Sequence, residues 1–240
     1  MGESEGARVK GGLKPRGEQT ETNFMLYIVA TPIGNLGDIT NRARQVFSDA
    51  DIVLCEDTRV TSKLMAHLQV RPTLMAFHEH TDALARKKIV DQLVSGMNMA
   101  LVTDAGTPGI SDPGGFLVAD AVAAGVKVSP IPGASAAIAA LSIAGIALDR
   151  FTFVGFPPNK KGREKFFREI GEIDHAVVMY ESTHRIVKTL EAMKSLHRKL
   201  IVCRELTKIH ETIYRGTAES ILIDLEKTSI RGEFVIVVDR

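Results

Sequence analysis

The stretch MALVTDAGTPGISDPG, from Met99 to Gly114, decides the fold class of this chain. Its first four residues are apolar, which predicts a short buried strand. The loop that follows is dense in Gly, Pro and small polar residues, which pack poorly but let the backbone come close to a bound molecule. We interpret Ser111-Asp112-Pro113 as the start of a helix over Phe116–Ala124. The stretch therefore predicts a strand, a ligand-binding loop and a helix in succession.

Strand and helix patterns alternate on both sides of this stretch, from Phe24 to residue 131. The predicted strands are Met25–Ala30, Ile52–Cys55, Thr73–Phe77, Met99–Val102 and Val126–Ile131. The predicted helices are Asn41–Phe47 after the cap Thr40, Arg59–Leu68 after Thr58, Asp82–Ser95 after Thr81, and Phe116–Ala124, with Gly96 and Gly125 as the stops of the last two. Strands that alternate with helices predict a parallel sheet covered on both faces.

The second half of the chain follows a helix of small residues over Ala136–Ala144. Its predicted strands are Phe151–Gly155, Ala176–Tyr180, Leu200–Arg204, Glu211–Arg215 and Glu233–Asp239, and its predicted helices are Gly162–Ile170, Thr183–Ser195 and Ala218–Leu225. The last strands lie close together in sequence, which favours antiparallel pairing and hence a mixed sheet. We expect a disordered tail over residues 1–22, an N-terminal α/β domain over 23–148 and a C-terminal α/β domain over 149–240.

Composition sets broad limits on function. The chain has 240 residues, 45% of them hydrophobic and 25% charged, which is ordinary for a globular protein with a substantial core. The net charge of +1 gives no overall basic field for nucleic acid, although a local basic patch would not show in the sum. Cys55 and Cys203 lie in apolar runs, so we expect buried free thiols in a reducing compartment. No apolar run could span a membrane and the N-terminus has no secretory signal, so we expect a cytoplasmic protein.

Four loops with ligand-binding character follow four of the first-half strands. They are residues 31–40, 55–59, 103–114 and 132–135. Each has a plainer alternative, such as a tight turn, a helix cap or the close packing of a helix on the sheet. In a doubly wound sheet all four loops leave the same edge, which is where such sheets bind ligands. Their coincidence on one edge favours a binding site over four independent turns.

Charged motifs lie at the ends of strands in the second half. Tyr180–Arg185 and Arg204–Thr212 each follow a strand, and Arg231–Glu233 precedes the last one. Each alone could be a solvated strand end, but together they offer cations for phosphate groups and carboxylates for proton transfer. His78-Glu79-His80 is a weak candidate for metal binding, and since no other His or Cys pair has ligand spacing we expect no metal site.

Seven motifs together resemble those of the ribosomal RNA small subunit methyltransferase I family, within the tetrapyrrole methylase (class III methyltransferase) superfamily. They are Leu26–Thr40, Glu56–Arg59, Asp104–Gly114, Pro130–Gly133, Tyr180–Arg185, Arg204–Lys208 and Arg231–Phe234. The resemblance runs from about Met25 to Val238 and implies two α/β domains, with S-adenosylmethionine in the cleft between them, in a homodimer. It further implies methyl transfer to the ribose 2′-oxygen of a cytidine in the decoding region of 16S rRNA.

The resemblance also implies which residues bind the cofactor. These are Pro32, Gly34, Asp104, Ala105, Gly106, Thr107, Ile110, Ser135, Ala136, Glu181 and Leu206. The chain departs from the family pattern at Ala134 and Ser135, where relatives often carry Pro and then Ser or Cys. Many relatives also continue beyond the Gly-Glu-Phe strand into a small helical domain, whereas this sequence ends at Arg240. If that domain helps to dock RNA, this chain must bind RNA in another way.

Charge type and motif position suggest the catalytic residues. We expect Glu205 or Glu181 to accept a proton, and Lys208, Asp57 and Arg59, with Glu56 nearby, to complete the catalytic set. The expected RNA-binding residues are Arg59, Arg185, Lys208 and His210. Two alternatives stay open. One is a methylase of a tetrapyrrole or of a translation-factor side chain on the same fold, and the other is a non-catalytic S-adenosylmethionine-dependent module that binds the ribosome.

Overall fold

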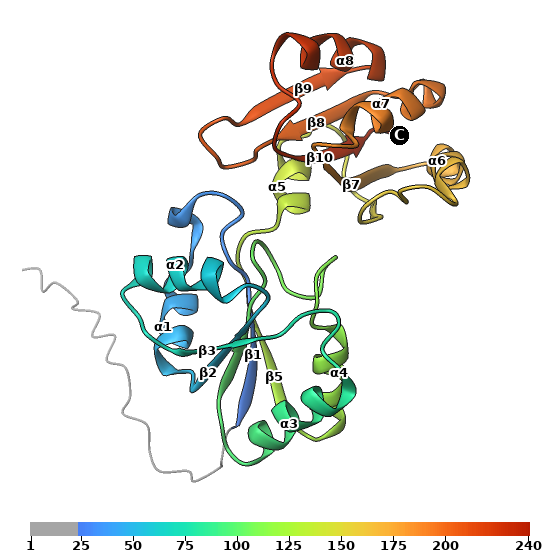
Figure 1. Ribbon diagram of the computed structural model, residues 1–240. Coiled ribbons are helices and arrows are strands. Elements are labelled where there is room, and N and C mark those ends of the chain that lie inside the picture. The colour runs from blue at the N-terminus through green and yellow to red at the C-terminus, as the bar shows by residue number, and fades with distance from the viewer. Residues whose placement is uncertain (1–23) are drawn as a thin grey trace, which may run out of the picture.

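A computed structural model describes residues 24–240, and it contains two five-stranded sheets that follow one another along the chain (Figure 1). The tail expected over residues 1–22 lies outside the described residues. Within residues 24–240, no helix is both long and apolar enough to cross a bilayer.

The first sheet is parallel throughout, in the strand order β3-β2-β4-β1-β5. Its strands are β1 (Met25–Val29), β2 (Ile52–Cys55), β3 (Thr73–Ala76), β4 (Met99–Leu101) and β5 (Lys127–Ile131). The short apolar runs therefore form strands that are buried in the middle of the sheet, as β2 and β4 are over their full length. The predicted parallel sheet is confirmed.

Helices cover both faces of this sheet. They are α1 (Asn41–Asp49), α2 (Thr58–Leu68), α3 (Ala83–Val94) and α4 (Gly115–Ala123). Figure 1 shows α1 and α2 on one side and α3 and α4 on the other. Alternate strand residues explain this arrangement: Val53 packs with Phe47 of α1, while Leu54 packs with Leu117 of α4. The two faces of the sheet thus carry separate hydrophobic cores.

Three predicted helix caps are wrong. Asp57, and not Thr58, caps α2, because its carboxylate accepts the amide of Arg59 at 2.8 Å. Asp82 caps α3 in place of Thr81, whose hydroxyl instead accepts the amide of His78 and closes the preceding turn.

The third wrong cap concerns α4 (Gly115–Ala123), whose range agrees with the predicted Phe116–Ala124 but whose N-cap is Gly114, at a backbone φ of 140°. A Cβ on Gly114 would come within 2.9 Å of Leu101, so the chain passes tightly over the end of β4 before it turns helical. The predicted start at Ser111-Asp112-Pro113 therefore lies in the loop and not in the helix.

The second sheet is mixed, in the order β6-β7-β10-β8-β9. Its strands are β6 (Phe151–Phe153), β7 (Ala176–Ser182), β8 (Leu200–Arg204), β9 (Thr212–Gly216) and β10 (Glu233–Val238). The pair β6 and β7 is parallel and the other pairs are antiparallel. The predicted mixed sheet is confirmed.

One face of the second sheet carries α6 (Arg163–Glu172), α7 (Ile186–Met193) and α8 (Ala218–Lys227). The other face is covered by α5 (Ala136–Ser142), whose Ala137, Ala140 and Leu141 pack on Val178 and Val235. The α5 helix precedes the boundary expected after residue 148, so a segment of the first half covers the second sheet. The domain division at 148/149 stays a prediction.

Both cysteines are free and buried. Burial raises the pKa of Cys55, and it raises the pKa of Cys203 to about 11. The thiols therefore remain protonated at neutral pH and behave as small core residues.

Candidate active site between the two sheets

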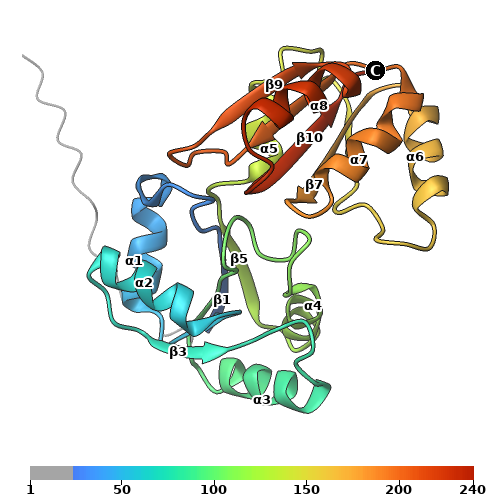
Figure 2. The same ribbon diagram turned by 45° about the horizontal axis from the view of Figure 1, so that its top comes forward.

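A cavity of about 250 Å³ lies between the two halves of the chain. Figure 2 shows the loops of the first sheet facing the second sheet. The lining residues are Ile33, Glu56, Thr103, Asp104, Ala105, Gly106, Thr107, Ile110, Ser111, Asp112, Ser135, Ala136, Phe156, Tyr180, Glu181, Cys203, Leu206, Lys208, Glu233, Phe234 and Val235. Each of the four predicted loops, residues 31–40, 55–59, 103–114 and 132–135, contributes at least one lining residue, which agrees with their predicted convergence on one edge.

Hydrogen bonds join these loops to one another. Thr31 and Gly106 exchange backbone hydrogen bonds of 2.9 and 3.1 Å, and the φ of 84° at Gly106 allows the turn that this exchange needs. The Thr107 hydroxyl donates to the carbonyl of Ala134 at 3.2 Å. The amide of Asp57 donates to an Asp104 carboxylate oxygen at 3.3 Å. The first-half wall of the cavity is therefore one connected unit.

Three carboxylates, from Glu56, Asp104 and Asp112, give this wall negative charge. The pKa of Asp112 is raised to about 6, mainly because the carboxyl is buried. The nearby charges of Glu56 and Asp104 raise this pKa further, and a hydrogen bond from Thr103 lowers it. Burial also raises the pKa of Asp104. Among residues 24–240 none of the three makes an ion pair. The wall is therefore suited to a ligand with positive charge.

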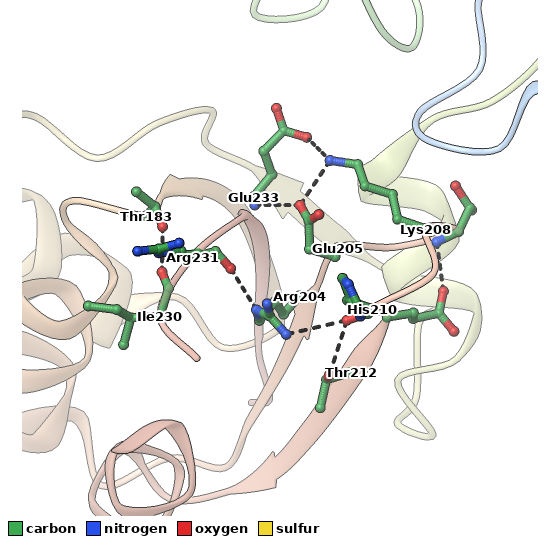
Figure 3. Close-up of polar contacts among 11 residues, drawn as sticks. Thr183, Arg204, Glu205, Lys208, His210, Thr212, Ile230, Arg231 and Glu233 are labelled. Atoms are coloured by element: carbon green, nitrogen blue, oxygen red, sulfur yellow. Dashed lines mark hydrogen bonds and ion pairs between the residues drawn. The ribbon is translucent and has the colours of Figure 1, made fainter. Parts of the chain in front are cut away.

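The opposite wall carries a paired lysine. The Nζ atom of Lys208 lies 2.9 Å from a Glu205 oxygen and 2.8 Å from a Glu233 oxygen, as Figure 3 shows. The same Glu205 oxygen accepts the amide of Glu233 at 2.9 Å. Burial raises the pKa of Glu205, but the Lys208 and Glu233 hydrogen bonds outweigh it and leave the pKa below its usual value. For Lys208, burial lowers the pKa, but the two carboxylates leave it raised. At neutral pH the group is therefore an ammonium between carboxylates.

The two halves touch at Gly34. A Cβ on Gly34 would overlap the Cγ of Lys208 and lie 3.1 Å from the carbonyl oxygen of Leu206. Only glycine lets the first loop come this close to the turn that carries Lys208. In that turn Glu205 and Thr207 have φ values of 53° and 65°. The buried Thr207 hydroxyl has no hydrogen-bond partner among the described residues.

A buried polar network supports the second-half wall from behind. The Glu181 side chain is fully buried, accepts hydrogen bonds from the Ser182 amide at 2.7 Å and the Thr189 hydroxyl at 2.5 Å, and forms an ion pair with Nε of Arg185 at 2.8 Å. The Arg185 Nε itself donates to the Ser182 hydroxyl at 3.1 Å. Thr189 in turn accepts Nη2 of Arg163 at 2.6 Å. The charge of Glu181 is thus neutralised inside the protein.

This network also fixes the segment that precedes α6. Arg185 donates to the carbonyl of Pro157 at 2.9 Å and to Asn159 at 2.5 Å, and Arg163 donates to the carbonyl of Pro158 at 3.0 Å. The adjacent Phe156 lines the cavity and packs edge-on against Tyr180, with ring centroids 5.6 Å apart. The network therefore positions an aromatic part of the wall.

Most predicted cofactor residues line the cavity. They are Asp104, Ala105, Gly106, Thr107, Ile110, Ser135, Ala136, Glu181 and Leu206. Pro32 and Gly34 do not line it, but Ile33 between them does. The binding role of each residue stays a prediction.

The predicted catalytic and RNA-binding residues are spread more widely. Lys208 lines the cavity and holds Glu205 beside it. Asp57 and Arg59 form an ion pair with each other outside the cavity, with 88% of the Arg59 side chain exposed. Arg185 belongs to the buried network. His210 has an exposed side chain, and its carbonyl oxygen accepts hydrogen bonds from Arg204 and Thr212 (Figure 3).

Sequence reasoning assigned no binding role to several lining residues, above all Phe156 and Asp112. Phe156 has a recognisable signal, because the run Gly155-Phe-Pro-Pro follows a strand and resembles the other loops in composition. Asp112 was assigned to a helix start and instead faces the cavity. Within the described residues, no group of three or more His, Cys, Asp or Glu side chains is placed to hold a metal ion, and this includes His78 and His80.

Comparison with known proteins shows what the chain is similar to. The family model described as Tetrapyrrole (Corrin/Porphyrin) Methylases matches residues 25–222. The "Ribosomal RNA small subunit methyltransferase I" of Halalkalibacterium halodurans is 42% identical over 92% of this chain and 78% of its own length. The protein of the same name from Haemophilus influenzae is 44% identical over 92% of this chain and 80% of its own length.

Solved structures agree on the fold. A diphthine synthase superimposes with a TM-score of 0.70 at 14% identity, covering 90% of this chain and 89% of its own. A cobalt precorrin-4 methyltransferase gives a TM-score of 0.66 at 18% identity, and the match covers 95% of this chain and 98% of that structure's chain. With both the family model and close relatives matched over most of its length, the chain belongs to the tetrapyrrole methylase family and, within it, to the ribosomal RNA small subunit methyltransferase I family.

Proposed function

We propose that this protein transfers a methyl group from S-adenosylmethionine to the ribose 2′-oxygen of a cytidine in the decoding region of 16S rRNA. The rRNA substrate is supported by two relatives, 42% and 44% identical to this chain, that are both named as ribosomal RNA small subunit methyltransferase I. The observation that carries the chemistry is the pairing of two unlike walls. Three carboxylates without ion pairs face a lysine held between two other carboxylates, across a cavity of about 250 Å³.

The residues present fit S-adenosylmethionine. When bound, this cofactor supplies a transferable methyl group on a positively charged sulfur. The wall of Glu56, Asp104 and Asp112 has the charge to accept such a ligand, and the apolar lining, including Leu206 and Val235, can hold its uncharged parts. The residues that would hold it are Asp104, Ala105, Gly106, Thr107, Ile110, Ser135, Ala136 and Leu206, with Pro32 and Gly34 supporting the first loop.

Lys208 and Glu205 activate the acceptor hydroxyl. A ribose hydroxyl is a poor nucleophile until its proton leaves, and the Lys208 ammonium stabilises the negative charge that develops on that oxygen. Glu205 is held against Lys208 at 2.9 Å and accepts the proton. Asp112, with its pKa near 6, is the second carboxylate able to do so. Glu181 is occupied by Arg185 and Thr189, so we assign it to the support of the wall.

The enzyme acts in the cytoplasm as a homodimer on the small ribosomal subunit. Arg59 and His210 are exposed on opposite halves, where they can contact RNA phosphates. Arg185 is bound internally and contributes to substrate binding only through the segment at residues 157–159 that it holds.

The test is methylation of small subunits from a strain that lacks the modification. Purified protein is incubated with the labelled methyl donor and these subunits, and the label is mapped by nuclease digestion. We expect label on one cytidine ribose of 16S rRNA, and none with subunits that already carry the methyl group. Label on a base, a protein or an added tetrapyrrole would overturn the proposal in favour of another methylase. Subunit binding without transfer would indicate a non-catalytic module.

A further inference from the structure

A second concave surface lies away from the cavity, between α6 and α7. It is a groove of about 1090 Å³ lined by Lys160, Gly162, Arg163, Glu164, Lys165, Phe167, Arg168, Gly171, Lys188, Ala192, Ser195 and Leu196. Figure 2 shows α6 and α7 side by side on the same side of the second sheet.

The groove is strongly basic in a chain that is nearly neutral. Its lining has five basic side chains and one acidic side chain, Glu164, whereas the whole chain has 30 Lys and Arg against 29 Asp and Glu. Such a local excess produces a positive field that the total charge conceals.

Most of the groove's exposed cations lack acidic partners. Within residues 24–240 neither Lys160, Arg168 nor Lys188 makes an ion pair, and Lys165 lies 3.5 Å from Glu169. Lys87, Arg150 and Lys227 are examples of surface cations outside the groove that do pair with an aspartate, at 2.6 to 3.2 Å. Unpaired cations gathered on one groove fit an external anion with several charges.

The groove is also fixed in position relative to the cavity. Phe156 lines the cavity and Lys160 lines the groove, so the segment at residues 156–160, which spans at most about 14 Å, joins the two sites. Arg185 and Arg163 hold this segment through Pro157, Pro158 and Asn159. Arg163 also lies under the groove, with its guanidinium over the ring of Phe167 at 4.9 Å.

From these observations we propose that the α6–α7 groove binds the sugar–phosphate backbone of the RNA substrate, a few nucleotides from the methylated one. This inference rests on the proposed function for the identity of the RNA. Repeated phosphates match several cations gathered on one groove, and the segment at 156–160 sets the distance from these contacts to the reacting nucleotide.

The test replaces three unpaired groove cations, in the variant Lys160→Ala/Arg168→Ala/Lys188→Ala. The matched control, Lys87→Ala/Arg150→Ala/Lys227→Ala, removes the same charges from cations that have partners elsewhere. Binding of 16S rRNA is measured by filter retention from 50 to 300 mM salt, and methyl transfer is measured against subunit concentration. The groove variant should lower the slope of log affinity against log salt by about 2. It should raise KM about 10-fold while kcat stays within about twofold, and the control should change neither.

Single substitutions keep the test independent of folding. At the exposed Arg168 we expect Arg168→Glu to weaken RNA binding more than Arg168→Ala, with unchanged thermal unfolding. A wild-type salt slope and KM in the triple variant would overturn the inference. Loss of affinity for whole subunits, with unchanged affinity for naked rRNA, would overturn it in favour of a protein partner. If the wild type methylates no RNA, the proposed function fails, while the salt slopes of binding still report on the groove.

Discussion

The two walls of the cavity differ in whether their charged side chains form ion pairs. On the first-half wall Glu56, Asp104 and Asp112 have no ion pair among the described residues, and burial raises the pKa of Asp112 to about 6. On the second-half wall the charges are neutralised within the protein: Glu205 lies against Lys208, and the fully buried Glu181 lies against Arg185. The first wall therefore keeps unfavourable electrostatics that a cationic ligand would relieve, whereas the second is complete without one.

This difference has a physical consequence for the two sheets. The parallel sheet delivers backbone and carboxylates at its edge through loops that hydrogen-bond mainly to one another. The mixed sheet delivers side chains whose positions depend on their ion-pair partners. Removing a charge should therefore destabilise the protein on the second wall and stabilise it on the first, where it reduces repulsion between carboxylates. Substitutions on each wall can test this.

The largest effect is expected for Glu181→Gln. The neutral amide leaves the Arg185 guanidinium without its buried counter-charge, which should lower the free energy of unfolding by about 3 kcal/mol. The measurement is urea denaturation followed by circular dichroism. The exposed pair of Glu191 and Lys194 provides the control, since Glu191→Gln should cost at most about 1 kcal/mol. Equal losses in the two variants would contradict the view that the second wall depends on its internal pairing.

Next in size is the effect of Lys208→Ala on the reaction. The substitution removes the cation between Glu205 and Glu233, which we propose stabilises the reacting oxygen, so kcat should fall about 100-fold. Single-turnover methyl transfer measures this rate, and cofactor binding is measured separately by calorimetry. Lys227→Ala, at a surface pair with Asp224, should leave the rate unchanged. A wild-type rate in Lys208→Ala would remove Lys208 from the proposed chemistry.

A smaller effect on the same rate is expected for Gly34→Ala, which acts where the two walls meet. The added Cβ overlaps the Cγ of Lys208, so the first loop and the Lys208 turn must move apart. This displacement should lower the rate about 10-fold while the fold persists. Gly115→Ala is the matched control, because a Cβ there meets nothing within 4 Å. If Gly34→Ala retains full activity, close contact between the walls is not needed.

The fold could be predicted largely from the sequence, because its signals are local. Apolar runs such as Ile52–Cys55 and Leu200–Arg204 coincide with the observed strands, and Thr40 caps α1 as predicted. The helix starts at Asp57 and Asp82 were missed because neighbouring Thr and Asp residues compete for the same cap, and only the backbone geometry decides between them. That α5 packs on the second sheet depends on tertiary contacts, which no local pattern encodes.

The roles of the site residues were harder to predict, because charged residues that look alike in the sequence have different surroundings in the structure. Glu181 and Glu205 look alike in sequence, yet Glu181 is fully buried against Arg185 and Glu205 lies beside Lys208. Arg59 and Lys208 are both basic motif residues, but only Lys208 reaches the cavity. Asp112 looked like a helix cap because it precedes Pro113, and the tight passage at Gly114 moves the helix start beyond it.

The smallest effect, and the one with the opposite sign, is expected for Asp112→Asn. Its folded-state pKa of about 6 lies above the usual value of 3.8, so its contribution to stability is complete only below about pH 4 and is lost as the pH rises through 6. At pH 8 the ionised group opposes folding, and the amide should raise Tm by about 2 °C, a modest gain because the side chain is only half-buried. This gain should shrink as the pH falls and vanish by about pH 4.

Ligand binding should respond in the opposite direction. Affinity for S-adenosylmethionine should weaken several-fold in the wild type as the pH falls below 6, and in Asp112→Asn it should be weak at every pH, because both changes remove one negative charge from the wall. Asp120→Asn is the contrasting control in the same half. Asp120 is paired with Arg86 at 2.8 Å, so its loss should not raise Tm. A higher Tm in Asp120→Asn, or an unchanged Tm in Asp112→Asn, would contradict the prediction. It would mean that the absence of an ion pair does not identify the carboxylates that destabilise the fold.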